Sequence, residues 1–209
     1  AVIKISNKMS AVTVDGCTIE AQAGALLGTI VRKAYENSLS GLEFAAGIPG
    51  SFGGAVTMNA GAYGSDMKHI VKSIFVCDRN GNCFNIEGDE LMFGYRQSVV
   101  RQKNFIVLSG EIELQEREKT EIKEKMDTLT AKRKAMQPLS MPSCGSVFKR
   151  PEGHFIGKLI EDAGLKGTSV GDAEVSQLHA NFIVNKGNAT ARDVLELIEV
   201  IKAKVKNTF

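Results

Sequence analysis

The sequence of 209 residues lacks the features that mark membrane proteins and nucleic-acid-binding proteins. No apolar run approaches the roughly 18 residues that a helix needs to span a bilayer. No signal peptide is recognisable, because Lys4 and Lys8 interrupt the short apolar run at the start. The formal net charge of +2 is close to balance. We therefore expect neither a nucleic acid nor a membrane surface as a partner.

Cysteine and histidine are also scarce, with four and three residues. The cysteines form no CxxC motif or Cys/His cluster, so we predict no metal site. Cys77 and Cys83 flank a turn at Asn80-Gly81-Asn82 and could face each other across a hairpin. Scattered thiols of this kind are typical of reduced structural cysteines, and we expect a cytoplasmic protein. With three histidines, no Ser-His-Asp set can be assembled from the spacing.

The composition, 43% hydrophobic and 24% charged, is that of an ordinary globular protein. Apolar residues that alternate or recur at helical spacing predict both strands and helices. In the first part of the chain we expect strands at 1–5, 12–14, 17–23, 70–77, 83–86 and 104–114, a helix over 27–34 and a charged helix within 115–136. In the last part we expect strands at 146–148 and 181–184 and a helix near 155–163. A final helix begins at Thr190, with Asp193 as its capping-box partner.

A domain boundary is predicted after the charged helix. The charges of that helix alternate in sign, which favours a solvated helix over a binding tail. Pro138 and Pro142 then end the helix and make the chain extended before Ser143. We place one domain at 1–137 and a smaller one at 138–209.

The glycine-rich segment at 45–64, AAGIPGSFGGAVTMNAGAYG, is the first candidate for a site. Glycine is concentrated where a chain turns unusually or approaches something closely, and N–H groups left free by such turns can attract a phosphate. The segment is not a P-loop, because no Lys-Ser/Thr follows its last glycine. A loop that contacts a ligand and a tight loop at a domain seam both fit this pattern.

Three further segments carry reactive side chains. Tyr95 and Arg96 in FGYRQS could hold a carboxylate or phosphate, or could be a surface arginine beside a core aromatic residue. Ser146 in SCGSVFKRP lies between a glycine and a short apolar run, outside any GxSxG motif, and could instead bond to backbone. His179 precedes a buried strand, and we interpret it as a hydrogen-bonded structural residue.

In this order, the four segments resemble the family of UDP-N-acetylenolpyruvoylglucosamine reductases. The resemblance rests on GLEFAAGIPGSFGGAVTMNAGAYG, FGYRQS, PSCGSVFKRP and GLKGTSVGDAEVSQLHANFIVN, and it covers nearly the whole chain. The GIPGSxGG loop alone is shared with other flavoproteins, whereas the ordered set is far more specific. The resemblance implies a partial FAD-binding domain of the vanillyl-alcohol-oxidase (PCMH) type followed by a smaller α+β substrate-binding domain. The compact last part is similar to the shorter class, which lacks a tyrosine loop.

The resemblance also implies a reaction, the NADPH- and FAD-dependent reduction of UDP-N-acetylglucosamine enolpyruvate to UDP-N-acetylmuramate for peptidoglycan. It makes Ser146 the proton donor and Arg96 the group that stabilises the intermediate. Some members carry asparagine where Arg150 stands. No oligomer is implied. Residues expected to bind the substrate are Tyr95, Lys149 and Arg150, and those expected to bind FAD are Gly47, Ile48, Pro49, Gly50, Ser51, Gly53, Gly54, Ala55, Asn59 and Ala60.

Two departures from the family pattern affect this expectation. The chain starts after the family's GxGSN phosphate loop and stops before the strand that carries a catalytic glutamate. We therefore expect the chain alone to bind FAD weakly or not at all and to be inactive. Glu196 and Glu199 lie within the last helix and cannot replace that glutamate. Two alternatives stay open, another FAD oxidoreductase of the same fold and a non-catalytic domain that binds a nucleotide sugar.

Overall fold

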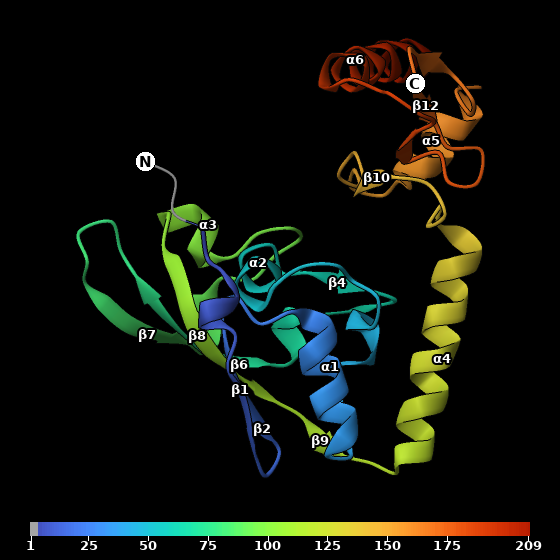
Figure 1. Ribbon diagram of the computed structural model, residues 1–209. Helices are drawn as coiled ribbons and strands as arrows, with labels where there is room; N and C mark the ends of the chain where they lie inside the picture. The colour runs from blue at the N-terminus through green and yellow to red at the C-terminus, as the bar shows by residue number, and fades with distance from the viewer. Residues whose placement is uncertain (1–3) are drawn as a thin grey trace. The chain divides into compact units, whose positions relative to one another are not determined.

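The computed structural model describes residues 4–209 (Figure 1). The chain forms two compact units, Ala1–Ala131 and Lys132–Phe209, which are described separately. The division falls inside helix α4 (Lys119–Met136), and the predicted boundary after residue 137 stays a prediction. Part of the strand predicted at 1–5 lies outside the described residues, and Lys4 and Ile5 are not in a strand.

The first unit is built on a five-stranded antiparallel sheet in the order β1-β2-β8-β6-β7. Its strands are β1 (Val12–Asp15), β2 (Thr18–Gln22), β6 (Val71–Cys77), β7 (Cys83–Glu87) and β8 (Ile106–Glu113). The predicted strands in these regions are confirmed, because their alternation is strong enough to be visible locally. Strand β8 lies in the middle, so residues far apart in the sequence meet on it.

Two helices cover one face of this sheet, α1 (Leu27–Glu36) and α2 (Phe52–Thr57) (Figure 1). The apolar face predicted for α1 is confirmed, since Leu27, Ile30, Val31 and Ala34 are all buried. Helix α2 is anchored by Phe52, which is fully buried against Gly110 of β8. A Cβ at Gly110 would lie 3.1 Å from the Phe52 ring, so glycine there makes room for α2.

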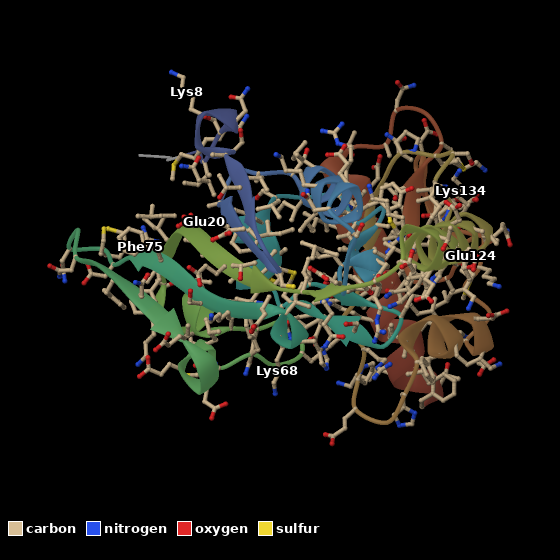
Figure 2. All side chains as sticks on the ribbon, turned by 90° about the horizontal axis from the view of Figure 1, so that it is seen from below. Lys8, Glu20, Lys68, Phe75, Glu124 and Lys134 are labelled. Carbon is tan, nitrogen blue, oxygen red and sulfur yellow. The ribbon has the colours of Figure 1, made fainter. Side chains whose placement is uncertain are left out.

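The other face of the sheet carries polar and exposed side chains. Glu20 on β2 and Phe75 on β6, both labelled in Figure 2, lie on this face. The unit also contains the remaining short elements: β3 (Leu39–Ser40), β4 (Gly61–Ala62), β5 (Ser65–Asp66), α3 (Val99–Lys103), β9 (Gln115–Glu116), and 3-10 helices η1 (Asn7–Met9), η2 (Glu43–Ala45), η3 (Met67–His69) and η4 (Gly88–Leu91).

The second unit packs two helices on a four-stranded sheet in the order β10-β13-β12-β11. Its elements are β10 (Ser143–Ser146), α5 (Ile156–Asp162), β11 (Ser169–Val170), β12 (Ala173–Val175), β13 (Phe182–Asn185) and α6 (Ala191–Thr208). Ile160 of α5 and Leu197 of α6 are fully buried in the core. The predicted capping box at the start of α6 is confirmed, with Thr190 and Asp193 bonded in both directions.

One strand boundary was predicted wrongly in this unit. We expected a strand at 146–148, but β10 ends at Ser146. The reason is that the Phe148 backbone is bonded to the Asn181 side chain instead of a strand partner. Within residues 4–209, no helix has the length and the apolar character to cross a membrane.

Candidate active site

The glycine-rich segment presents an open backbone surface just before α2. Gly47 and Gly50 have φ angles of 79° and 141°, which side-chain-bearing residues rarely adopt. Gly47, Pro49 and Gly50 are exposed, and Ile48 is half-buried. A Cβ at Gly50 would meet no atom within 4 Å. The loop therefore leaves space where a ligand could approach the main chain.

Not every residue of this segment faces that space. Gly53 is buried, because a Cβ there would lie 2.9 Å from the Cβ of Ala23. Ala55 and Asn59 are also buried, and Ala60 is half-buried against the core. At Ala55, Asn59 and Ala60 the small or polar side chain serves the packing of the unit, and at Gly53 the lack of a side chain does.

The N–H groups at the start of α2 are already bonded within the chain. Those of Phe52 and Gly53 donate to the carbonyl oxygens of Ala25 and Ala23. That of Gly54 donates to the hydroxyl of Ser51, which caps the helix. Free N–H groups were the basis for expecting a phosphate at this segment, and these three do not supply them.

A turn that carries Tyr95 and Arg96 lies beside the glycine-rich segment. The Nδ2 of Asn59 donates to the Gly94 carbonyl oxygen at 3.1 Å, and the Ser98 hydroxyl donates to the Thr57 carbonyl oxygen at 2.9 Å. Asn59 and Ser98 are 3% and 0% exposed. The structure therefore brings the arginine predicted for catalysis next to the segment predicted to bind the cofactor.

The conformation of Arg96 is fixed by its surroundings. Its φ angle is 56°, in the left-handed region, and its carbonyl oxygen accepts a bond from Arg101. Its guanidinium carbon lies 5.2 Å from the ring centroid of Tyr95, a cation–π contact. Arg96 is half-buried and Tyr95 is 54% exposed. The half-exposed side chain of Arg96 can therefore face a ligand while its backbone is held in one conformation.

The second unit presents Ser146 at the end of β10. Between Ser143 and Ser146 the pairing with β13 shifts by a bulge, and Gly145 has a φ angle of 80°. Bulges bend a strand and redirect side chains, and they are common beside active sites. Ser146 and Lys149 are exposed. Arg150 is also exposed, and its guanidinium carbon lies 5.2 Å from the Phe155 ring centroid.

His179 has the structural surroundings that the sequence predicted. Its Nδ1 accepts the backbone N–H of Asn181 at 3.2 Å, and its ring packs edge-on against Phe182. Burial lowers the pKa of His179, and the charge of Lys166 acts in the same direction. The ring is therefore neutral at physiological pH, as an Nδ1 that accepts a hydrogen bond requires.

Comparison with known proteins assigns both units to one family. Residues 137–209 match the model of the UDP-N-acetylenolpyruvoylglucosamine reductase C-terminal domain, and residues 1–87 match that of an FAD binding domain. The chain is 52% identical over 203 residues to UDP-N-acetylenolpyruvoylglucosamine reductase of Clostridium perfringens strain SM101, covering 97% of the chain and 67% of that protein. It belongs to this reductase family.

Two further relatives agree with the assignment. The enzyme of the same name from Alkaliphilus oremlandii is 51% identical over 208 residues, covering 100% of the chain and 68% of the relative. The crystal structure of the Thermus caldophilus reductase matches with a TM-score of 0.85 at 40% identity, covering 94% of the chain and 71% of that structure. The predicted family and α+β fold are confirmed. The chain spans about two thirds of the length of these relatives.

The open glycine surface fits the FAD that the reductase family uses. The segment at 45–64 contains no charged residue, so nothing in it repels an anionic cofactor. A Cβ at Gly54 would lie 3.7 Å from the hydroxyl oxygen of Ser51, which is an ordinary van der Waals contact. A flat group can therefore approach the main chain. The residues that are exposed or half-buried on this surface are Gly47, Ile48, Pro49, Gly50, Ser51 and Gly54. That they bind FAD stays a prediction.

Two asparagines have roles that the sequence did not reveal. Asn59 was predicted to contact the cofactor, and its side chain instead bonds within the chain to Asp66, Lys68 and Gly94. No sequence pattern indicated a role for Asn181, although its side chain holds the segment after Ser146. Among residues 4–209, no group of side chains could hold a metal ion.

Proposed function

We propose that the full-length protein reduces UDP-N-acetylglucosamine enolpyruvate to UDP-N-acetylmuramate, with FAD as cofactor and NADPH as the source of electrons. Family membership supports the reaction, and the names of the relatives state the reductase activity. The observation that carries the proposal is the attachment of the Arg96 turn to the glycine-rich segment through Asn59 and Ser98. FAD, when bound, supplies the hydride chemistry.

Arg96 is proposed to stabilise negative charge on the substrate. Hydride addition to the enolpyruvyl double bond places charge on the carbon next to the carboxylate, and the carboxylate shares it. A guanidinium stays charged at any physiological pH and presents a planar fork of donors to two oxygens. Because the Arg96 backbone is fixed in advance, little reorganisation is needed when this charge develops.

Ser146 is proposed to donate the proton that completes the reduction. A serine hydroxyl is a weak acid, but the carbanion is a strong base, so placement decides the rate more than acidity. The hydroxyl lies at the exposed end of β10, where the bulge at Gly145 redirects the chain. Lys149 and Arg150 follow within the same segment and supply positive charge for the diphosphate of the substrate, with Tyr95 as a further contact.

The test is a comparison of two half-reactions in the full-length protein. Ser146→Ala is expected to leave the bleaching of flavin absorbance by NADPH unchanged and to abolish product formation. Ser169→Ala, an exposed serine in the same unit, serves as the matched control and should form product normally. Arg96→Lys should lower kcat about 10²–10³-fold. Equal loss of both half-reactions in Ser146→Ala would rule out the proton-donor role.

The prediction that the 209-residue chain alone binds FAD weakly or not at all, and is inactive, stays a prediction. It is tested by measuring the flavin absorbance of the purified chain and its turnover beside the full-length protein. Stoichiometric flavin in the purified chain would contradict it.

A further inference from the structure

We propose that Asn181 is a positioning residue that fixes Ser146 and Lys149 for the reaction. The inference rests on the proposed function, because Ser146 and Lys149 take their roles from it. Asn181 immediately precedes β13 and is 5% exposed. Its Oδ1 accepts the Phe148 N–H at 2.9 Å, and its Nδ2 donates to the Phe148 carbonyl oxygen at 3.0 Å. Phe148 lies between the two functional residues in the sequence.

The two bonds replace the strand pairing that the segment lacks. An asparagine amide that accepts from an N–H and donates to the carbonyl of the same residue copies a backbone pair in a ladder. The Asn181 backbone adds a third contact, since its carbonyl oxygen accepts the Val147 N–H at 2.9 Å. Residues 147 and 148 are thus fixed to the second unit after β10 has ended.

The position of the segment makes this attachment necessary. Strand β10 is at the edge of its sheet and pairs only with β13. That pairing is irregular, because the four residues from Ser143 to Ser146 oppose three on β13, from Phe182 to Val184. A bulge disrupts the ladder locally, and an edge strand has backbone groups without a partner on its outer side, so the end of such a strand has few backbone bonds. The Asn181 side chain supplies the constraint at the place where the functional side chains emerge.

Asn181 is itself fixed by a neighbouring residue. Its backbone N–H donates to Nδ1 of His179, whose ring packs on Phe182 of β13. The backbone of Asn181 is therefore held by the half-buried ring of His179, which packs against the buried Phe182. Displacement of reacting groups by about 1 Å can cost about 10²-fold in rate. Loss of the bonds between Asn181 and Phe148 should therefore have a measurable effect on kcat.

The test uses Asn181→Asp and Asn181→Leu in the full-length protein. Asp has the same shape but places a carboxylate oxygen against the Phe148 carbonyl, and Leu removes both bonds. We expect flavin reduction by NADPH to change less than about 2-fold. We expect kcat for reduction of the enolpyruvyl substrate to fall about 10–100-fold, with a higher KM through Lys149. Amide hydrogen exchange at residues 147–149 should accelerate at least about 10-fold in Asn181→Leu.

The matched control is Asn185, the asparagine at the other end of β13. Its Oδ1 accepts the N–H groups of Gly187 and Ala189, which lie in the turn after β13, at the opposite end of the strand from Phe182. Asn185→Asp and Asn185→Leu should keep both half-reactions and the slow exchange at 147–149. If these variants lose product formation to the same extent as the Asn181 variants, positioning by Asn181 is overturned.

The remaining outcomes separate this inference from the proposed function. If Ser146→Ala stops product formation but the Asn181 variants work normally, the positioning role is wrong and the proposed function stands. If Ser146→Ala forms product normally, the role of Ser146 fails first. If Asn181→Leu does not fold, Asn181→Asp decides, and an equal loss of both half-reactions in it would mean a purely structural residue.

Discussion

The side chain of Asn59 holds the backbone of Gly94 at a sequence separation of 35 residues, with 3.1 Å between Nδ2 and the carbonyl oxygen. The same Nδ2 donates to Asp66, and the Oδ1 accepts the backbone N–H of Lys68, which Figure 2 labels. A residue of the glycine-rich segment thus supports the turn that carries Arg96. The segment predicted to bind the cofactor and the turn of the arginine proposed for catalysis are therefore parts of one hydrogen-bonded structure.

Asn59→Ala should destabilise the first unit strongly. The substitution removes the part-buried bonds of Asn59 to Asp66, Gly94 and Lys68 and places alanine at a φ angle of 41°. We expect the free energy of unfolding in urea to fall by about 2–4 kcal/mol. Asn104→Ala is the matched control, because Asn104 is exposed and has a φ angle of 56°. The free energy of unfolding of this variant should fall by only about 1 kcal/mol, because alanine is strained at a positive φ angle. Equal losses in the two variants would show that the Asn59 bonds contribute little.

Gly53 and Gly54 should respond differently to the same substitution. Gly53→Ala places a Cβ 2.9 Å from Ala23, so we expect a loss of about 1–3 kcal/mol in unfolding free energy. At Gly54 the nearest atom is the Ser51 hydroxyl oxygen at 3.7 Å, so Gly54→Ala should leave stability unchanged. If Gly54 lies against FAD, Gly54→Ala should instead weaken flavin retention, which gel filtration and flavin absorbance measure. Unchanged flavin retention would remove Gly54 from the cofactor surface.

The parts of the fold that sequence predicts are those encoded by local periodicity. The strands β1, β2, β6 and β7 and the buried face of α1 follow from alternation or helical spacing within a few residues. The roles of Asn59 and Asn181 depend on partners 35 and 33 residues away, and no local pattern records such a pairing. The end of β10 was missed for the same reason, since the side chain of Asn181, just before β13, decides it.

Acid should weaken the contact between Glu43 and α4. Burial opposes ionisation of Glu43, but bonds from Ser40, Gly41 and Lys125 outweigh it and lower its pKa. A lowered pKa means that the carboxylate stabilises the fold above its unfolded pKa of about 4.3. That contribution is lost as the pH falls through the folded pKa.

Glu43→Gln should therefore cost about 1–3 kcal/mol at pH 7 and progressively less below about pH 4.3. Unfolding in urea across this pH range measures the difference from the unchanged protein. Glu124→Gln, at an exposed position of α4 that Figure 2 labels, is the control and should have little effect at any pH. A cost for Glu43→Gln that does not vary with pH would contradict the assignment.

The thiols of Cys77 and Cys83 should form a disulfide under mild oxidation. They are direct partners across β6 and β7, and their Sγ atoms lie 2.8 Å apart. The neighbouring pair is backbone-bonded, from the Asp78 N–H to the Asn82 carbonyl oxygen. Alternation along the ladder makes the cysteines a non-hydrogen-bonded pair, with Cα atoms about 4.5 Å apart. This separation is within the range of disulfides.

Oxidised glutathione is the appropriate reagent for this test. One molecule is reduced to two thiols while Cys77 and Cys83 lose two electrons and two protons. The hydrogen bond with Cys83 raises the pKa of Cys77, so attack should start at the exposed Cys83 thiol and accelerate with pH. Intact mass should fall by two hydrogens, and the closed hairpin should gain about 2 kcal/mol in unfolding free energy. Cys77→Ser should instead retain a glutathione adduct at Cys83, and a persistent adduct in the unchanged protein would show that the pair cannot close.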